Sequence, residues 1–114
     1  PRTNMLYNRQ EKFMRIIVFF DLPVGTKRER KYATRFRNDL LNDGYYMMQF
    51  SVYSRIVKGL AGMEKHLQRL RHLTPPSGSI RVLTVTEKQF ADMLFLVGTA
   101  PTAEKIGSQQ LLMF

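Results

Sequence analysis

The chain has 114 residues, with 18 Lys or Arg against 9 Asp or Glu, so its formal net charge is +9. This length fits one domain with a single core, and the excess of cations favours an anionic partner such as nucleic acid. The absence of cysteine excludes a disulfide framework, a thiolate zinc site and a cysteine nucleophile. No apolar run is long enough to span a membrane and no signal-peptide pattern is present, so we expect a cytoplasmic protein without a membrane partner.

Three regions follow from the distribution of apolar residues. Residues 1–12 form an N-terminal extension, residues 13–98 form one domain, and residues 99–114 form a C-terminal tail. The chain opens on Pro1, so we interpret the first few residues as part of a cloning remnant and Met5 as a candidate native start. The apolar end of the tail, Leu111–Phe114, is expected to pair with a partner subunit.

The segment Phe13–Phe20 is almost wholly apolar and predicts a strand covered on both faces. Pro23 discourages a helical conformation at Leu22, so the strand should end at once and leave Asp21 at its rim. Thr26 then begins a capping-box pattern for a helix that Gly44 ends.

Two strands, a helix and a further strand are expected next. Two short aromatic strands are expected at Tyr45–Met48 and Ser51–Ile56. A second amphipathic helix follows and ends before Pro75-Pro76. Ser79–Thr86 alternates like a strand, a turn follows, and Met93–Val97 predicts an extra C-terminal strand.

These elements predict an α+β fold of the ferredoxin-like type, βαββαβ, with both helices on one face of an antiparallel sheet. The opposite face then has no cover from the chain itself, although Phe13–Phe20 and Met93–Val97 are apolar on both sides. Because a soluble monomer rarely exposes so large an apolar area, we expect a homodimer that buries this face.

Asp21 is the first candidate for chemistry. A carboxylate at a strand end can hold Mg²⁺, which activates water for phosphodiester hydrolysis, and a two-fold dimer could bring two such residues together. The alternative, that Asp21 ends the strand and bonds nearby amides, is the more frequent case. His66 and His72 lie six positions apart on one helix, too far round it to chelate a metal together, and are expected on a solvated helix face.

The cations are better organised than the carboxylates. They crowd the two helices, on sides that the apolar stripes leave free, and acids do not alternate with them on the first helix. Such spacing suits phosphates rather than base edges, so the sequence predicts nucleic-acid binding. The candidate residues are Lys27, Arg28, Arg30, Lys31, Arg35, Arg37, Lys65 and Arg69.

Three segments, Phe19–Pro23, Gln49–Tyr53 and Val82–Phe90, together resemble the small CRISPR-associated adaptation protein, partner of the adaptation integrase, in its type II form. The resemblance implies a ferredoxin-like homodimer that bridges integrase dimers and holds duplex DNA during spacer acquisition in antiviral defence. It also implies that Asp21 matches the proposed Mg²⁺ ligand of a metal-dependent endonuclease activity, and that Ser51 lies near that site. The family often has Tyr before this aspartate, where the present chain has Phe20.

The leading hypothesis is therefore a structural, duplex-DNA-binding subunit whose integration chemistry resides in the partner integrase. The alternative is an Mg²⁺-dependent endonuclease that acts on RNA or double-stranded DNA through the Asp21 of both subunits. A generic single-strand RNA-binding module is disfavoured, because Gln49–Arg55 lacks the glycine-containing aromatic signature that this module needs on a central strand.

Overall fold

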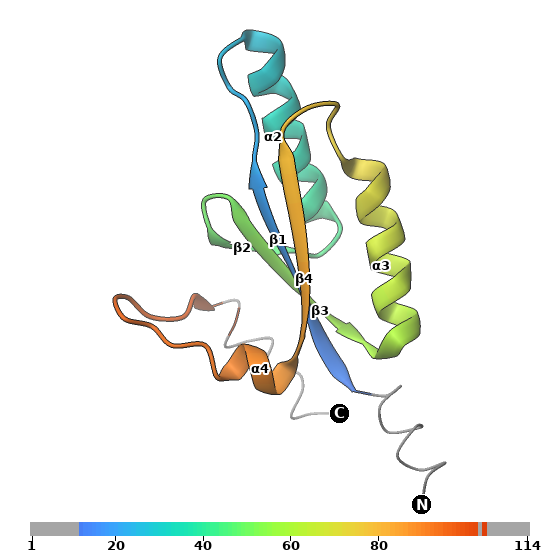
Figure 1. Ribbon diagram of the computed structural model, residues 1–114, viewed down its shortest axis with the longest axis vertical. Helices are drawn as coiled ribbons and strands as arrows, with labels where there is room; N and C mark the ends of the chain where they lie inside the picture. The colour runs from blue at the N-terminus through green and yellow to red at the C-terminus, as the bar shows by residue number, and fades with distance from the viewer. Residues whose placement is uncertain (1–11, 103, 105–114) are drawn as a thin grey trace, which may run out of the picture.

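The structure is a computed structural model that describes residues 12–102 and residue 104. Its centre is an antiparallel sheet with the strand order β2-β3-β1-β4, and α2 and α3 lie side by side on one face (Figure 1). This arrangement confirms the ferredoxin-like α+β class. The elements are β1 (Phe13–Asp21), α2 (Lys27–Asn42), β2 (Tyr46–Gln49), β3 (Val52–Lys58), α3 (Gly59–Leu73), β4 (Ser79–Thr86) and α4 (Glu87–Ala91).

The core forms between β1 and the two helices. β1 pairs with β3 on one side and β4 on the other, so its side chains alternate between the two faces of the sheet. Ile16, Val18 and Phe20 point toward α2 and α3, and the Phe20 ring meets Phe36 of α2 edge to face with 5.1 Å between centroids. Each large side chain buried here contributes about 1.5–3 kcal/mol, which fixes α2 and hence its exposed side.

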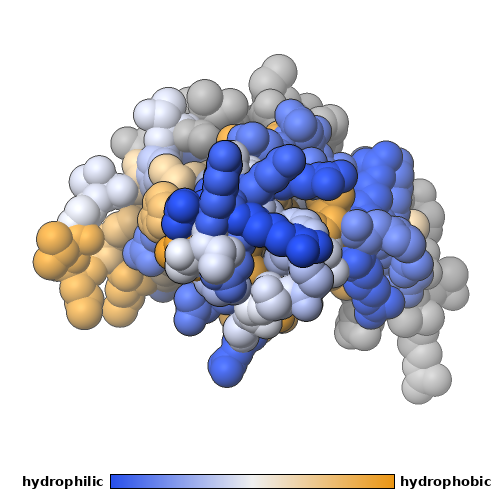
Figure 2. Space-filling view, turned by 90° about the horizontal axis from the view of Figure 1, so that it is seen from above, coloured by the Kyte–Doolittle hydropathy of each residue, from blue (hydrophilic) through white to orange (hydrophobic). Residues whose placement is uncertain are grey.

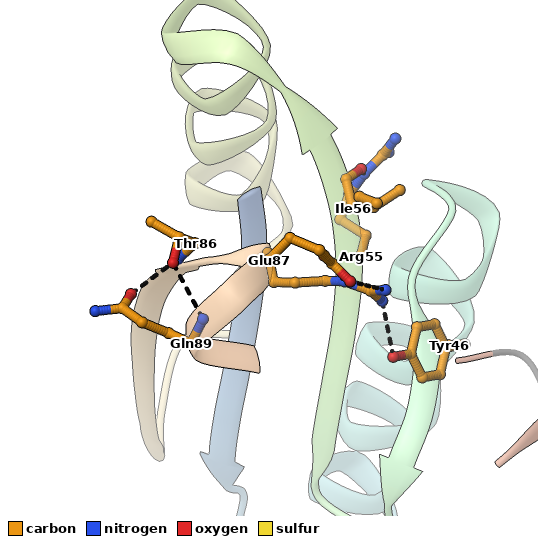
Figure 3. A network of polar contacts seen from close by, with 7 residues as sticks. Tyr46, Arg55, Ile56, Thr86, Glu87 and Gln89 are labelled. Atoms are coloured by element: carbon orange, nitrogen blue, oxygen red, sulfur yellow. Dashed lines mark hydrogen bonds and ion pairs between the residues drawn. The ribbon is translucent and has the colours of Figure 1, made fainter. Parts of the chain in front are cut away.

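The opposite face is covered at one end by α4. Arg15, only 1% exposed, donates to both carboxylate oxygens of Glu87 at 2.8 and 3.0 Å and to the Tyr46 hydroxyl at 3.0 Å. Its guanidinium also lies 4.3 Å from the centroid of the Phe90 ring. Figure 3 draws Glu87 of α4 and Tyr46 of β2, the two side chains that bind this guanidinium. The expectation that the chain leaves this face without cover was therefore wrong at the Arg15 end.

The other end of that face remains open. Phe19 on β1 is 38% exposed and Leu83 on β4 is 51% exposed. The expected turn at Glu87–Phe90 is the short helix α4, while the extra strand expected at Met93–Val97 is not formed. Strand residues need a neighbouring strand for their amide and carbonyl groups, and no strand of the described chain pairs with this segment. The segment instead projects away from the sheet, with Leu96 93% exposed (Figure 1).

Some expectations fall outside the described residues. The candidate start Met5 lies there, as does the apolar end Leu111–Phe114. Within residues 12–102, no helix is long and apolar enough to cross a lipid bilayer.

Candidate nucleic-acid interface

The first turn of α2 is fixed by a capping box, which sets the direction in which the cations of this helix point. The Thr26 hydroxyl accepts a hydrogen bond from the Glu29 amide at 3.1 Å, and the Glu29 carboxylate accepts one from the Thr26 amide at 2.9 Å. This reciprocal pair confirms the expected capping box and fixes the first turn at Lys27. Ala33, Phe36 and Leu40 bury one side of the helix, so the basic residues of its first half lie on the solvent side.

These residues line a groove of about 570 Å³. Arg28 donates from Nη2 to the Tyr32 hydroxyl at 3.3 Å, and its guanidinium carbon lies 5.6 Å from the Tyr32 ring centroid. This hydrogen bond, together with the positive charge of Arg28, lowers the pKa of Tyr32. The groove therefore combines cations with one aromatic side chain; its lining residues are Lys27, Arg28, Lys31, Tyr32 and Arg35.

Little negative charge opposes these cations. Among the described residues, no carboxylate pairs with Lys27, Arg28 or Lys31, while Arg35 lies 4.0 Å from Asp39. The amino end of α2 adds the positive pole of the helix dipole. Figure 2 looks down on this end of the molecule and shows hydrophilic side chains gathered over it. The arrangement can bind closely spaced anions such as consecutive phosphates.

The remaining basic candidates are placed elsewhere. Arg30 donates to the Val24 carbonyl at 3.0 Å, Lys65 is exposed on α3, and Arg69 pairs with Asp43 at 3.1 Å. The structure thus brings four of the eight predicted phosphate ligands into the groove and distributes the others around it. Arg37, the eighth, lies over the aromatic rings of Phe20 and Phe50.

Asp21 lies at the end of β1, beside the turn that joins β2 and β3. The Phe20 amide donates to the Ser51 carbonyl at 3.0 Å, so the backbones of Ser51 and of the Asp21 strand end are adjacent, as the resemblance implies. The Asp21 side chain is exposed and has no hydrogen-bond or ion-pair partner within residues 12–102 and 104. The alternative in which this carboxylate bonds nearby amides therefore gains no support.

Asp21 is not part of a cluster of metal-ligating side chains within the described residues of one chain. Across the part of the chain that the structure describes, no three His, Cys, Asp or Glu side chains come together to hold a metal ion. Mg²⁺ favours oxygen ligands and is usually held by one or two carboxylates together with substrate phosphates and waters. The described residues of a single copy therefore supply fewer than three such side chains at Asp21, and the Asp21 of a second copy would add a carboxylate to a shared site.

His66 was expected on a solvated helix face, and this expectation was wrong. Its side chain is 12% exposed, with Nδ1 lying 3.5 Å from Asp43 Oδ2 and 3.1 Å from Arg55 Nη1. Burial lowers the pKa of His66, as does the charge of Arg55. Because Arg55 donates toward Nδ1, the neutral imidazole fits this position, which joins α2, β3 and α3.

Two aromatic residues of this region were absent from the predicted site. Tyr32 belongs to the apolar stripe of α2 in the sequence, yet its hydroxyl reaches the basic groove. Phe50 lies between the two expected strands in the sequence, and in the structure it is 72% exposed in the turn that joins them. For Tyr32 the sequence signal was Arg28 at i−4, whereas Arg37 lies thirteen positions from Phe50 and gave no such signal.

Comparison with known proteins identifies relatives over most of the chain. The family described as "CRISPR associated protein Cas2" matches residues 14–93. The chain is 55% identical to a protein from Acidovorax ebreus named "CRISPR-associated endoribonuclease Cas2", over 89% of the chain and all of that protein. Proteins of the same name from Campylobacter jejuni and Flavobacterium psychrophilum are each 43% identical; the matches cover 88% and 92% of this chain, and 70% and 91% of those proteins.

A solved structure shares the fold. The chain superposes on a protein described as "Crystal structure of cas2" with a TM-score of 0.53 and 22% sequence identity. The match covers 79% of this chain and 92% of that protein. This similarity supports the ferredoxin-like arrangement and carries no information on the activity.

Proposed function

The chain belongs to the Cas2 family of CRISPR-associated proteins, and from this premise we propose that it is a structural subunit that binds duplex DNA during spacer acquisition. The observation that carries the proposal is the α2 groove, where Lys27, Arg28 and Lys31 have no carboxylate partner among the described residues. Exposed cations on a helix contact the phosphate backbone without reading bases, which suits a protein that must hold DNA of any sequence.

A second copy of the chain is part of this proposal. The open end of the sheet face and the exposed segment after α4 present apolar surface, with Leu94, Leu96 and Val97 each more than four-fifths exposed. Burying this surface against another copy would place two α2 grooves on one assembly. Such a homodimer could bridge two dimers of the adaptation integrase, which would supply the integration chemistry.

Salt dependence tests the proposal directly. Each phosphate contact contributes about −0.9 to the slope of log K against log salt concentration for duplex DNA. Removing two contacts with Arg28→Gln/Lys31→Gln should therefore flatten the slope by about 1.8 per copy, measured by fluorescence anisotropy with a labelled duplex of arbitrary sequence. The control is Arg71→Gln/Lys88→Gln, which removes the same charge from exposed positions outside the α2 groove.

The comparison of the two double variants decides the outcome. Equal slopes for the variant and the control would show that the duplex does not lie in the α2 groove. Failure of the native protein to bind duplex DNA at low salt would refute the proposed function itself. Sedimentation of the free protein tests the dimer, which Leu96→Asp should weaken by placing a charge on the apolar surface.

A second candidate function is an endonuclease, favoured by the name endoribonuclease that the relatives carry. Here Mg²⁺ would be held by the Asp21 of both copies, which together would supply two carboxylates. We expect little cleavage by the native protein, because one chain supplies a single carboxylate and Phe20 provides no hydroxyl beside it. Mg²⁺-dependent cleavage of labelled RNA or duplex DNA that Asp21→Asn abolishes and Asp92→Asn preserves would reverse this ranking, provided that the dimer stays intact.

A further inference from the structure

Phe50 is an exposed aromatic side chain that neither the fold nor the groove explains. It lies in the turn between β2 and β3 and is 72% exposed. Single exposed apolar residues are common on protein surfaces, so exposure alone carries no argument. The contacts that Phe50 makes with Arg37 distinguish it from the other exposed apolar residues.

Arg37 holds the Phe50 ring from one side. Its guanidinium carbon lies 3.9 Å from the Phe50 centroid, close enough for the two planar groups to be in contact. Arg37 Nη1 also donates to the Phe50 carbonyl, and the same guanidinium lies 4.9 Å from the Phe20 ring. Since Phe20 is part of the core, Arg37 fixes the Phe50 ring relative to the sheet while most of that ring stays open to solvent.

The position of this pair is also informative. Ser51 follows Phe50 and accepts a hydrogen bond from Phe20, directly beside the β1 end that carries Asp21. Arg37 is a residue of α2, the helix whose first half carries the basic groove. A strand of nucleic acid bound to these cations would therefore find the exposed Phe50 ring at the same end of the molecule.

We propose that Phe50, backed by Arg37, is a stacking platform for an unpaired nucleobase beside the Asp21 end of β1. This inference rests on the proposed nucleic-acid function and adds a ligand class to it, namely single-stranded nucleic acid. An aromatic ring with a supporting arginine accepts any base on its free face, and the cation attracts the flanking phosphate. A base in an intact duplex is already stacked on its neighbours and cannot use the ring, so the platform distinguishes unpaired from paired nucleotides.

The test uses variants of Phe50 and two probes. One probe is a short single-stranded oligothymidylate with one 2-aminopurine, whose fluorescence falls on stacking; the other is a blunt duplex. Phe50→Leu keeps an apolar side chain and removes the ring, so it should weaken single-strand binding roughly 5- to 100-fold and reduce the fluorescence change. Phe50→Trp restores a stacking surface and should bind the single strand at least as well as the native protein. Neither variant should change duplex affinity.

Three results would overturn the platform. Equal single-strand affinity of the native protein and Phe50→Leu would exclude stacking on the ring, and an equal loss for both probes would assign Phe50 to general binding. Dissociation of the native dimer by Phe50→Leu in sedimentation would make Phe50 a subunit contact. These results can be told apart from failure of the proposed function, because in that case neither the native protein nor the Phe50 variants would bind the duplex.

Discussion

The buried ion pair between Arg15 and Glu87 provides the strongest test of how α4 is held on the sheet. We expect Glu87→Gln to destabilise the protein because it leaves the guanidinium of Arg15, 1% exposed, without the charge that compensates it. Tyr46 is neutral and cannot replace the carboxylate; burial raises its pKa further above the ordinary range. The substitution keeps the size of the side chain, so its effect reports mainly on charge.

The expected magnitude follows from the exposure of the two partners. Removing one member of a fully buried ion pair costs about 3–5 kcal/mol. The Glu87 side chain is 24% exposed and the carboxylate of Glu104 also interacts with Arg15, so water and a second charge offset part of this cost. We therefore expect a loss of about 2–3 kcal/mol in the free energy of unfolding, roughly 8–12 °C in melting temperature for a domain of this size.

A double variant tests whether the loss in Glu87→Gln comes from the unpaired charge of Arg15. Arg15→Met removes the buried charge and keeps a long side chain against the Phe90 ring, so Arg15→Met/Glu87→Gln should be more stable than Glu87→Gln alone. Urea denaturation at fixed protein concentration, followed by circular dichroism, measures all four proteins of the cycle. If the double variant lost the sum of the two single effects, Arg15 and Glu87 would not be coupled and the electrostatic argument would be refuted.

Three further predictions concern other contacts. The pKa of His66 is lowered in the folded state, so its contribution to stability is complete above about pH 6.5 and is lost as the pH falls through the lowered pKa. His66→Gln should therefore lose less stability on acidification than the native protein, measured by urea denaturation above about pH 6.5 and below the lowered pKa. Gly78→Ala should cost about 1–3 kcal/mol, because Gly78 has φ +106° and a methyl group there would approach Leu22 to 2.7 Å; an unchanged melting temperature would exclude this strain. Thr26→Ala should cost about 1 kcal/mol by removing the cap of α2, whereas Thr26→Ser should recover most of this loss in the same thermal assay.

Local patterns predicted the fold well because they depend on neighbours in sequence. The apolar run of β1, its end at Asp21 and the capping box at Thr26 all lie where the sequence places them. The segment Met93–Val97 has strand composition but no strand beside it, so composition alone could not predict its conformation.

The site was predicted in part, because a sequence gives the positions of charged residues but not the partners that their side chains contact. The groove cations follow from helical spacing, which the sequence contains. Arg37 meets Phe50 only because the hairpin folds back against α2, and His66 meets Asp43 only because α3 packs beside α2. The residues in these contacts are 13 and 23 positions apart in sequence. Helical or strand spacing predicts which residues are close only over a few positions, so it could not predict these contacts.

The central position of β1 has a consequence during synthesis on the ribosome. β1 is synthesised before its partner strand β4. Arg15 can pair with Glu87 only after a further 72 residues have been added to the chain. Until then a nearly continuous apolar strand is available to other nascent chains, and such segments favour aggregation. A lone arginine inside this strand interrupts its apolar character while β1 is unpaired, as charged gatekeepers do beside aggregation-prone segments. The residue that later anchors α4 would thus also protect the growing chain before α4 exists.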